Sequence, residues 1–389
     1  MNEEIELSFK ELKRYCEKEG FKGWDPYDGL NSKVFKALSL DKIRLFRLAW
    51  IQLFKRNPIN IRQLLFVPKE YNPKGLGLFL TGYCNLYKVN PKEEYLENIN
   101  FLAKKLIELQ SDGFSGACWG YNFDWQSRAF FLPKKTPTIV ATSFIASALL
   151  DAFEITKNNK YLDVAVSSAN FILKDLNRSS KNEGFIFSYS PFDDTCVYNA
   201  SLLGSKLLAH IYSYTKDEVL LEVARGSVIA CVNAQREDGA WIYGELSIQG
   251  WVDSFHTGYN LECISEYQKY SKDTSFQSSI DKGLEYYLTN FFLNDGTPKY
   301  YNNKINPIDI HAPAQLIATL SRMGVFNNNK VLVDKVLDWT INNMQNEREG
   351  FFYYQLKQGV SSKIPYMRWA QAWMFYAYSF YILEAGNDK

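Results

Sequence analysis

The feature that most constrains the fold is an acidic-glycine dipeptide that recurs five times between residues 112 and 350, at a spacing of roughly 55 to 70 residues. Each dipeptide follows a segment with apolar residues at helical spacing, and aromatic residues follow it, as in GFSGACWGY, GAWIY and GFFYY. We interpret the acidic residues mainly as turn formers. The pattern predicts helical hairpins joined by aromatic-rich loops. The dipeptides are Asp112-Gly113, Glu183-Gly184, Asp238-Gly239, Asp295-Gly296 and Glu349-Gly350.

A second helical segment begins after each loop, and most of these segments carry less charge than the helix before the loop. Residues 136–153, TPTIVATSFIASALLDAF, contrast with residues 91–110, PKEEYLENINFLAKKLIELQ. A helix that is apolar nearly all round is buried, whereas a charged stripe faces solvent. The chain is therefore expected to alternate outer and inner helices in one closed, all-α ring, with residues 40–87 supplying the first of about six pairs.

The domain boundary is expected between residues 39 and 40. Residues 1–39 are predicted to form an N-terminal helix and a covering loop, GWDPYDGLNS, because Trp24 in such a loop needs a surface to pack against. Residues 40–389 are predicted to form a single domain, since no linker interrupts them.

Composition excludes several classes of protein. The 44 Lys and Arg residues nearly balance 43 Asp and Glu residues, which argues against a nucleic-acid surface and gives no sign of membrane attraction. The first residues are charged, and no apolar run is expected to be long enough to span a bilayer. The six cysteines are scattered singly, which indicates free thiols in a reducing compartment. We expect a cytoplasmic protein without membrane insertion, and its oligomeric state is open.

Several motifs carry a resemblance to known families. The spacing of Gln235, Gly239 and Trp241 resembles the QW signature of terpene cyclase and prenyltransferase toroids, in which Gln caps a helix and Trp stacks over it. Six hairpins resemble the (α/α)6 toroid of six-hairpin glycosidases, uronyl hydrolases, sugar epimerases and polysaccharide lyases. From Gly23 onward, segments such as WGYNFDWQSRAFFLPKKTPT and GWVDSFHTGYN resemble bacterial and archaeal proteins that accompany polysaccharide-assembly enzymes.

Two histidines are the strongest candidates for chemistry. His256 and His311 lie about one repeat apart, each in the first turn of an inner helix and shortly after an aspartate. The ring should place them at similar height on adjacent helices, where an imidazole is a suitable general acid or base near neutral pH. Asp253 or Ser254 is expected to be the N-cap of the helix. Asp253 is also expected to assist His256, and Tyr259 to act beside it. The third histidine, His210, is expected to be a core or helix-end residue.

Two arginines are candidates for binding an anion. Arg128 follows Asp124 in the longest loop, and Arg368 begins the last inner helix beside Trp369. A guanidinium group binds two oxygens of a carboxylate at once, and aromatic rings stack on sugar faces. Asp124 and Arg128 are equally compatible with an ordinary ion pair, and the tryptophans with core packing. The predicted catalytic residues are His256, Tyr259, Asp253, Asp124 and His311, and the predicted substrate-binding residues are Trp119, Trp125, Arg128, Asn199, Trp251, Asp309, Arg368 and Trp369.

We therefore expect a carbohydrate-active enzyme of polysaccharide biosynthesis or processing that acts on an anionic, uronic-acid-containing glycan. Hydrolase, lyase and epimerase chemistry remain open, because paired carboxylates for hydrolysis are available among Asp124, Asp193, Asp194, Glu245, Asp253 and Asp309. No nucleotide-binding glycine motif or metalloprotease motif is found, so no cofactor and no metal are expected, although His256, His311 and Asp253 could together bind one. The alternatives are an isoprenoid cyclase-like enzyme and a non-catalytic glycan-binding protein.

Overall fold

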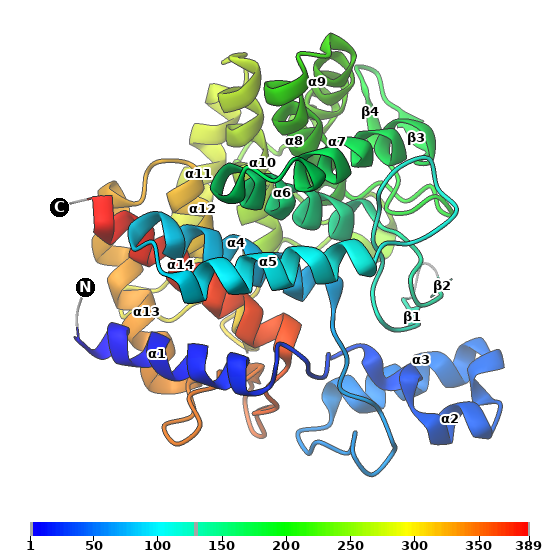
Figure 1. Ribbon diagram of the computed structural model, residues 1–389, viewed down its shortest axis with the longest axis vertical. Coiled ribbons are helices and arrows are strands. Elements are labelled where there is room, and N and C mark those ends of the chain that lie inside the picture. Colours follow the sequence, from blue (N-terminus) through cyan, green and yellow to red (C-terminus); the bar gives the residue numbers. More distant parts are fainter. Residues whose placement is uncertain (1–2, 128–130, 388–389) are drawn as a thin grey trace.

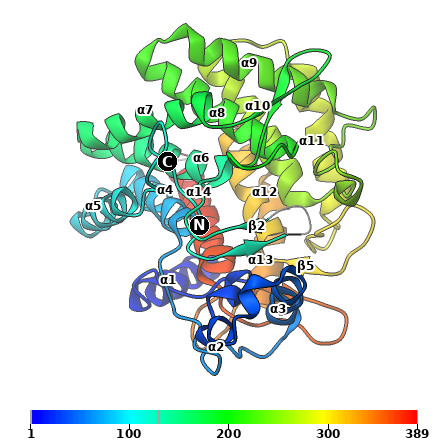
Figure 2. The same ribbon diagram turned by 90° about the vertical axis from the view of Figure 1, so that its right-hand side faces the viewer.

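The computed structural model describes residues 3–127 and 131–387, and these residues are mainly helical. An inner ring is made by α4, α6, α8, α10, α12 and α14, in which each helix packs on the next and α14 closes the ring against α4 (Figures 1 and 2). The inner helices are α4 (Pro73–Val89), α6 (Ile139–Thr156), α8 (Tyr198–Thr215), α10 (Ser254–Ser271), α12 (His311–Arg322) and α14 (Trp373–Asn387), the last preceded by a π-helical turn, η5 (Met367–Ala372).

An outer ring surrounds these helices. Its members are α1 (Glu3–Lys18), α5 (Glu93–Glu108), α7 (Asn159–Lys174), α9 (Glu218–Asn233), α11 (Gln277–Phe291) and α13 (Lys330–Met344). The outer helices bury one apolar stripe, whereas α6 and α8 are buried along almost their whole length. The predicted all-α (α/α)6 toroid, with alternating outer and inner helices, is confirmed.

The acidic-glycine turns hold neighbouring outer helices together. Gly296 has a φ of +90°, and a Cβ atom there would lie 2.3 Å from the carbonyl oxygen of Lys335 on the next outer helix. Gly350 has a φ of +78°, and its Cβ would lie 2.6 Å from the Cβ of Glu11 on α1. Only glycine fits both the left-handed backbone and the close approach. The last turn therefore meets the first helix and closes the outer ring.

Glutamines at two helix ends make the same connection. The Gln345 amide donates to the carbonyl oxygens of Gly350 (2.9 Å) and Ser8 (3.0 Å). Gln235 donates in the same way to Gly239 (2.9 Å) and Ser279 (3.0 Å). The QW-like glutamine thus joins its turn to the next outer helix.

Helix α1 corrects the expected organisation of the N-terminal part. It packs against α13 and α14 and is the outer helix of a pair whose two helices were both expected within residues 40–87 (Figure 1). The segment between α1 and α4 instead forms a cover over one mouth of the ring, and its α3 contacts β1. We use "cover" for residues 19–72. Its elements are η1 (Asp28–Asn31), α2 (Lys33–Ala37), η2 (Leu40–Lys42) and α3 (Arg44–Arg56).

Trp24 packs into the ring as expected, within a buried cluster that includes Phe54 of the cover and Tyr354 and Tyr366 of the last loop. The buried Asp28 accepts a hydrogen bond from Arg62 at 2.7 Å, which ties two parts of the cover together. The cover is thus a packed layer with its own ion pair.

Short strand pairs and 3-10 turns complete the loops, and all of them except η4, which connects the end of α12 to α13, precede the inner helices. Antiparallel pairs join β1 to β2, β3 to β4 and β5 to β6. These elements are β1 (Trp125–Gln126), β2 (Phe131–Leu132), β3 (Arg178–Ser180), β4 (Phe185–Phe187), β5 (Ile308–Asp309), β6 (Gln355–Leu356), η3 (Ser247–Gln249) and η4 (Asn327–Asn329).

One expectation about apolar segments was wrong. Helix α6, Ile139–Thr156, is long and apolar enough to cross a membrane by length and composition. In the structure, 72% of that stretch is buried inside the ring, as in the core helix of a closed toroid.

Candidate functional site

His256 is oriented by a buried carboxylate at the start of α10. Asp253, one of the two residues predicted as the N-cap, has that role and accepts a hydrogen bond from the His256 backbone N–H at 3.0 Å. The other Asp253 oxygen lies 2.7 Å from His256 Nδ1 and also accepts from the Trp251 indole at 2.9 Å. Because a carboxylate acceptor requires the proton on Nδ1, Nε2 is the nitrogen available to accept a proton. The His256 side chain remains 19% exposed.

His311 lies on the adjacent inner helix and is almost fully buried. Its Nε2 is 2.8 Å from the Tyr259 hydroxyl, and its ring stacks on Phe255 with centroids 4.3 Å apart. The His256 ring also contacts Phe255, with centroids 4.2 Å apart, and Tyr259. The structure therefore brings both predicted histidines to one aromatic cluster.

The protonation states of this pair are set by burial. Burial lowers the pKa of His311 well below its ordinary value, and the positive charges of Lys74, His256 and Arg368 lower it further. Burial raises the pKa of Tyr259, and the nearby Glu262 charge adds to that effect. A neutral imidazole thus faces a protonated phenol, joined to it by a hydrogen bond.

Asp309 holds the start of α12 and the ring of Trp369. One oxygen accepts from the Trp369 indole at 2.8 Å and from the His311 backbone N–H at 3.1 Å, and the other accepts from Gln355 at 3.0 Å. Burial raises the Asp309 pKa to about 6, and these donors oppose the rise. Asp309 therefore orients Trp369 beside His311 and is not exposed to a ligand.

The predicted anion-binding arginines need correction. Arg368 is 4% exposed and donates hydrogen bonds of 2.5 and 2.8 Å to the two oxygens of Asp25 in the cover. The Nε–Nη2 edge of its guanidinium group is bonded to that carboxylate, and the side chain is buried, so we no longer expect Arg368 to bind a substrate anion. Arg128 lies outside the described residues.

The tryptophans and the remaining candidates occupy different places. Trp119 is fully buried and donates to the Leu106 carbonyl at 2.7 Å, so it is a core side chain and presents no face to a sugar. Trp125 packs edge-on against Tyr27 and Tyr189, and Trp251 is 36% exposed and stacks on Tyr243 at 4.7 Å. These two, with Trp369, are the tryptophans at the mouth.

Asp124 and Asn199 do not touch the histidine cluster through any hydrogen bond within the described residues. Asp124 accepts from the Lys134 backbone N–H at 2.7 Å and lies 3.3 Å from Lys36 of the cover. It therefore fastens its loop. Asn199 is buried at the start of α8, and its Oδ1 has no hydrogen-bond partner in the described part of the chain.

Lys74 is the principal residue that the sequence analysis missed. It lies in the first turn of α4, is 4% exposed, and its Nζ is 4.3 Å from the centroid of Phe144. Tyr259 and Trp373 present their rings at 5.5 and 5.3 Å. Because the following residues, GLGLFL, are apolar, a single lysine at the start of an inner helix was a signal for it.

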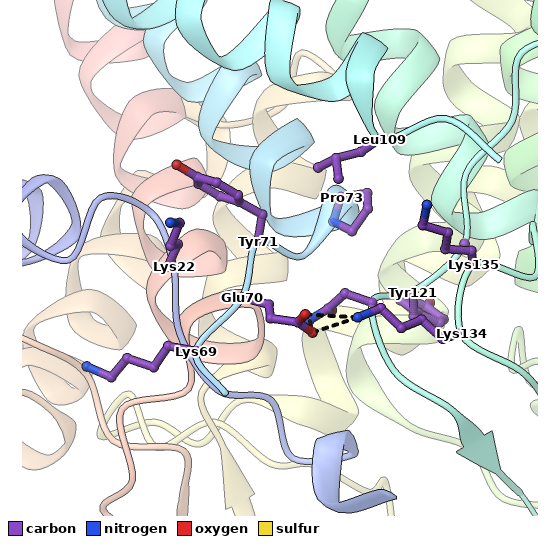
Figure 3. A pocket seen from close by; sticks show the side chains of 11 residues that line it. Lys22, Lys69, Glu70, Tyr71, Pro73, Leu109, Tyr121, Lys134 and Lys135 are labelled. Carbon is purple, nitrogen blue, oxygen red and sulfur yellow. Dashed lines mark hydrogen bonds and ion pairs between the residues drawn. The ribbon is translucent and has the colours of Figure 1, made fainter. Parts of the chain in front are cut away.

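A separate pocket of about 280 Å³ lies between the cover, the start of α4 and the loop after α5 (Figure 3). Lys134 bonds to both oxygens of Glu70 there, at 2.9 and 3.0 Å. None of the predicted site residues lines this pocket, so we place the candidate site at the histidines, where buried polar groups converge. The separate pocket is lined by Lys22, Lys69, Glu70, Tyr71, Pro73, Leu109, Gly120, Tyr121, Asn122, Lys134 and Lys135.

Within residues 3–127 and 131–387, no three His, Cys, Asp or Glu side chains are arranged to hold a metal ion. Asp253 is occupied by His256 and Trp251, and His311 by Tyr259.

The ring and its covered mouth define the chain as an (α/α)6 toroid. A cellobiose 2-epimerase from Bacillus thermoamylovorans B4167 has a similar structure, with a TM-score of 0.68 and 14% identity, over 99% of this chain and 100% of that one. An unsaturated glucuronyl hydrolase specific for heparin has a TM-score of 0.63 and 12% identity, over 99% of this chain and 97% of that one. A GH76 α-mannanase from Bacteroides thetaiotaomicron has a TM-score of 0.62 and 16% identity, over 80% of this chain and 86% of that one. No protein-family model and no curated protein sequence matches the chain.

Proposed function

We propose that this toroid is a carbohydrate-active enzyme that transfers protons at a carbon next to a sugar carbonyl, as an epimerase or isomerase does. The observation that carries the proposal is the pair of imidazoles at one mouth, with His256 oriented by Asp253 and His311 joined to Tyr259. Similar structures include sugar epimerases and a D-mannose isomerase, which supports a sugar substrate.

In the proposed reaction, His256 Nε2 takes the proton from the carbon beside the carbonyl of the open-chain sugar. The bonding electrons move to the carbonyl oxygen and give an enediolate. Tyr259 then donates its hydroxyl proton to the opposite face of that carbon. His256 releases the proton it took to solvent, and solvent returns one proton to Tyr259 through His311, so both groups regain their starting protonation. The carbonyl re-forms, no oxidant is needed, and the configuration at that carbon is inverted.

The aromatic surfaces of the mouth fit this substrate class. Trp251 stacks on Tyr243, and Trp125 and Trp369 flank Tyr27 of the cover. Rings of this kind cover the apolar faces of a sugar, while Nε2 of His256 supplies a polar contact. His311 Nδ1 and Trp373 Nε1 are buried without a hydrogen-bond partner among the described residues. Such polar atoms argue against the dry cavity of an isoprenoid cyclase.

Glycoside hydrolysis is the second candidate, and one observation favours it. The pKa of Asp309 is raised to about 6, which suits a general acid. Both Asp309 oxygens, however, accept hydrogen bonds from Trp369 and Gln355, and Asp253 is held by His256. A hydrolase needs two carboxyl groups that reach the glycosidic bond, so we rank hydrolysis second.

Location and pathway are also proposals. All six cysteines are unpaired and buried, which supports a reducing, cytoplasmic location. A cytoplasmic location, together with the sequence resemblance, favours a role in polysaccharide biosynthesis or in processing an oligosaccharide.

The deciding experiment incubates the purified protein in D₂O with cellobiose, mannose and glucuronate, and follows each sugar by NMR. Deuterium entering at the carbon beside the carbonyl, with a new epimer or ketose, is the expected result. His256→Gln should abolish it, whereas Lys160→Gln on an exposed outer helix should not. Release of monosaccharide without deuterium would favour hydrolysis. Binding without any reaction would favour a glycan-binding protein.

A further inference from the structure

Lys74 is a buried ammonium group that has no carboxylate partner within ion-pairing distance among the described residues. Its nearest compensation is three aromatic faces, from Phe144, Trp373 and Tyr259. Aromatic faces stabilise a cation, but only in part. A buried charge without an opposite charge is costly, so a site of this kind favours an incoming anion.

The charges around Lys74 do not balance. The charged groups that act on it are Arg368, which repels it, and Asp25, which attracts it. Both oxygens of Asp25 are already bonded to Arg368. The two cations therefore share a single carboxylate, and one positive charge is left over at the mouth.

The other buried lysine of the inner ring shows the contrast. Lys206 on α8 lies 2.8 Å from Glu262 and 3.5 Å from Glu266. Arg322 completes that network at 2.9 Å from Glu266. Two acids thus face two bases there, and no charge remains for a ligand.

Polar atoms beside Lys74 are also unsatisfied. Trp373 Nε1 and His311 Nδ1 are buried without a hydrogen-bond partner in the described residues, and their rings lie 4.0 Å apart. Lys74 contacts the Trp373 ring and Tyr259, which bonds to His311. An indole N–H and an ammonium group therefore lie in one cluster with the proposed proton-transfer pair.

We propose that Lys74 binds an anionic oxygen group of the sugar, the carboxylate of a uronate or the phosphate of a sugar phosphate, beside Tyr259 and His311. This proposal rests on the proposed function, because it assigns a substrate class to the same site. It moves the anion-binding role from Arg368 to Lys74. Burial and the Arg368 charge lower the pKa of Lys74, and an anion bound beside it would favour the protonated form.

The test is calorimetric titration of the wild-type protein with glucuronate, glucose 6-phosphate and glucose. At least one anionic sugar should bind tenfold or more tightly than glucose, and which one does so separates the carboxylate from the phosphate. Lys74→Met should remove that preference and leave the weak binding of glucose. Lys135→Met, in the separate lysine pocket, should keep the preference.

Two results would overturn the proposal. One is an unchanged preference in Lys74→Met, and the other is equal binding of glucose and both anions by the wild type. The outcome is separable from the proposed function. Lys74-dependent anion binding without deuterium exchange would refute the reaction alone, whereas deuterium exchange by a wild-type protein that binds glucose and both anions equally would refute the anion site alone.

Discussion

Arg368 and Asp25 lie 343 positions apart in the chain and are joined by two hydrogen bonds, of 2.5 and 2.8 Å. Arg368 begins the last inner helix, and Asp25 belongs to the cover. The pair therefore fastens the cover to the ring next to the proposed site. It also uses the carboxylate that would otherwise compensate Lys74.

Asp25→Asn should destabilise the protein by about 3–5 kcal/mol, because it leaves Arg368 and Lys74 as two buried cations without a carboxylate. Urea unfolding followed by circular dichroism measures the change. The double variant Asp25→Leu with Arg368→Met removes both charges and should be clearly more stable than Asp25→Asn. Equal losses in both variants would show that the pair contributes through packing and not through charge.

Gly350→Ala should be more destabilising than Gly113→Ala, although both glycines have positive φ, of +78° and +88°. A Cβ at Gly113 meets nothing within 4 Å, so only the backbone strain of roughly 1 kcal/mol applies. A Cβ at Gly350 meets Glu11, and α1 must shift. Thermal unfolding of the two variants compares them directly, and equal melting temperatures would contradict the role of this turn in closing the outer ring.

The repeat pattern predicted this ring because each hairpin repeats the same local sequence. It predicted the N-cap to within one residue, Asp253 or Ser254, and the meeting of His256 with His311, since both follow from position within the repeat. The place of α1 was not predictable in this way, because its neighbours lie at the other end of the chain.

The site residues divide along the same line. A histidine in a first turn is visible in the sequence, but the charge balance around Lys74 depends on Asp25 and Arg368, which come from distant segments. Trp119 carried the same sequence signal as Trp251, a tryptophan in an aromatic loop. Only packing separates the core residue from the exposed one.

Asp253→Asn should lower the proposed proton-transfer rate by roughly 10²- to 10⁴-fold, because the amide no longer holds the proton on Nδ1 of His256. Sugar binding should change far less. The rate of deuterium incorporation, measured with the sugar that the wild type exchanges, gives the comparison. Trp251→Phe removes the other donor to the same oxygen and should keep most of the rate. A loss in Trp251→Phe as large as in Asp253→Asn would place the effect in the loop.

His210 predicts part of the acid sensitivity of the fold. Its ring stacks on Tyr270 at 4.3 Å, and burial lowers its pKa to about 4 from an ordinary 6.5. The folded state therefore disfavours the protonated form, so the stability is fully present above pH 6.5 and falls as the pH drops towards 4. His210→Phe keeps the stacking and should remove a loss on the order of 2 kcal/mol over that interval. Urea unfolding at pH 7 and pH 4.5 measures the free energy of unfolding of the wild type and of His210→Phe. If His210 did not contribute to the acid sensitivity, the two proteins would lose the same free energy of unfolding between these pH values.

Lys74→Met should raise the melting temperature, whereas Lys206→Met should lower it. Removing the uncompensated Lys74 charge relieves a desolvation cost and keeps the apolar contacts with Phe144 and Trp373, for an expected gain of about 1–4 kcal/mol. Removing Lys206 instead leaves Glu262 and Glu266 facing only Arg322, at a cost of about 3–5 kcal/mol. Scanning calorimetry of both variants, without any sugar, reads these signs directly. Destabilisation of similar size in both variants would mean that the Lys74 charge is already compensated within the fold. A Lys74→Met variant that is stabilised and has also lost its preference for anionic sugars would show that Lys74 is kept for binding at the expense of stability.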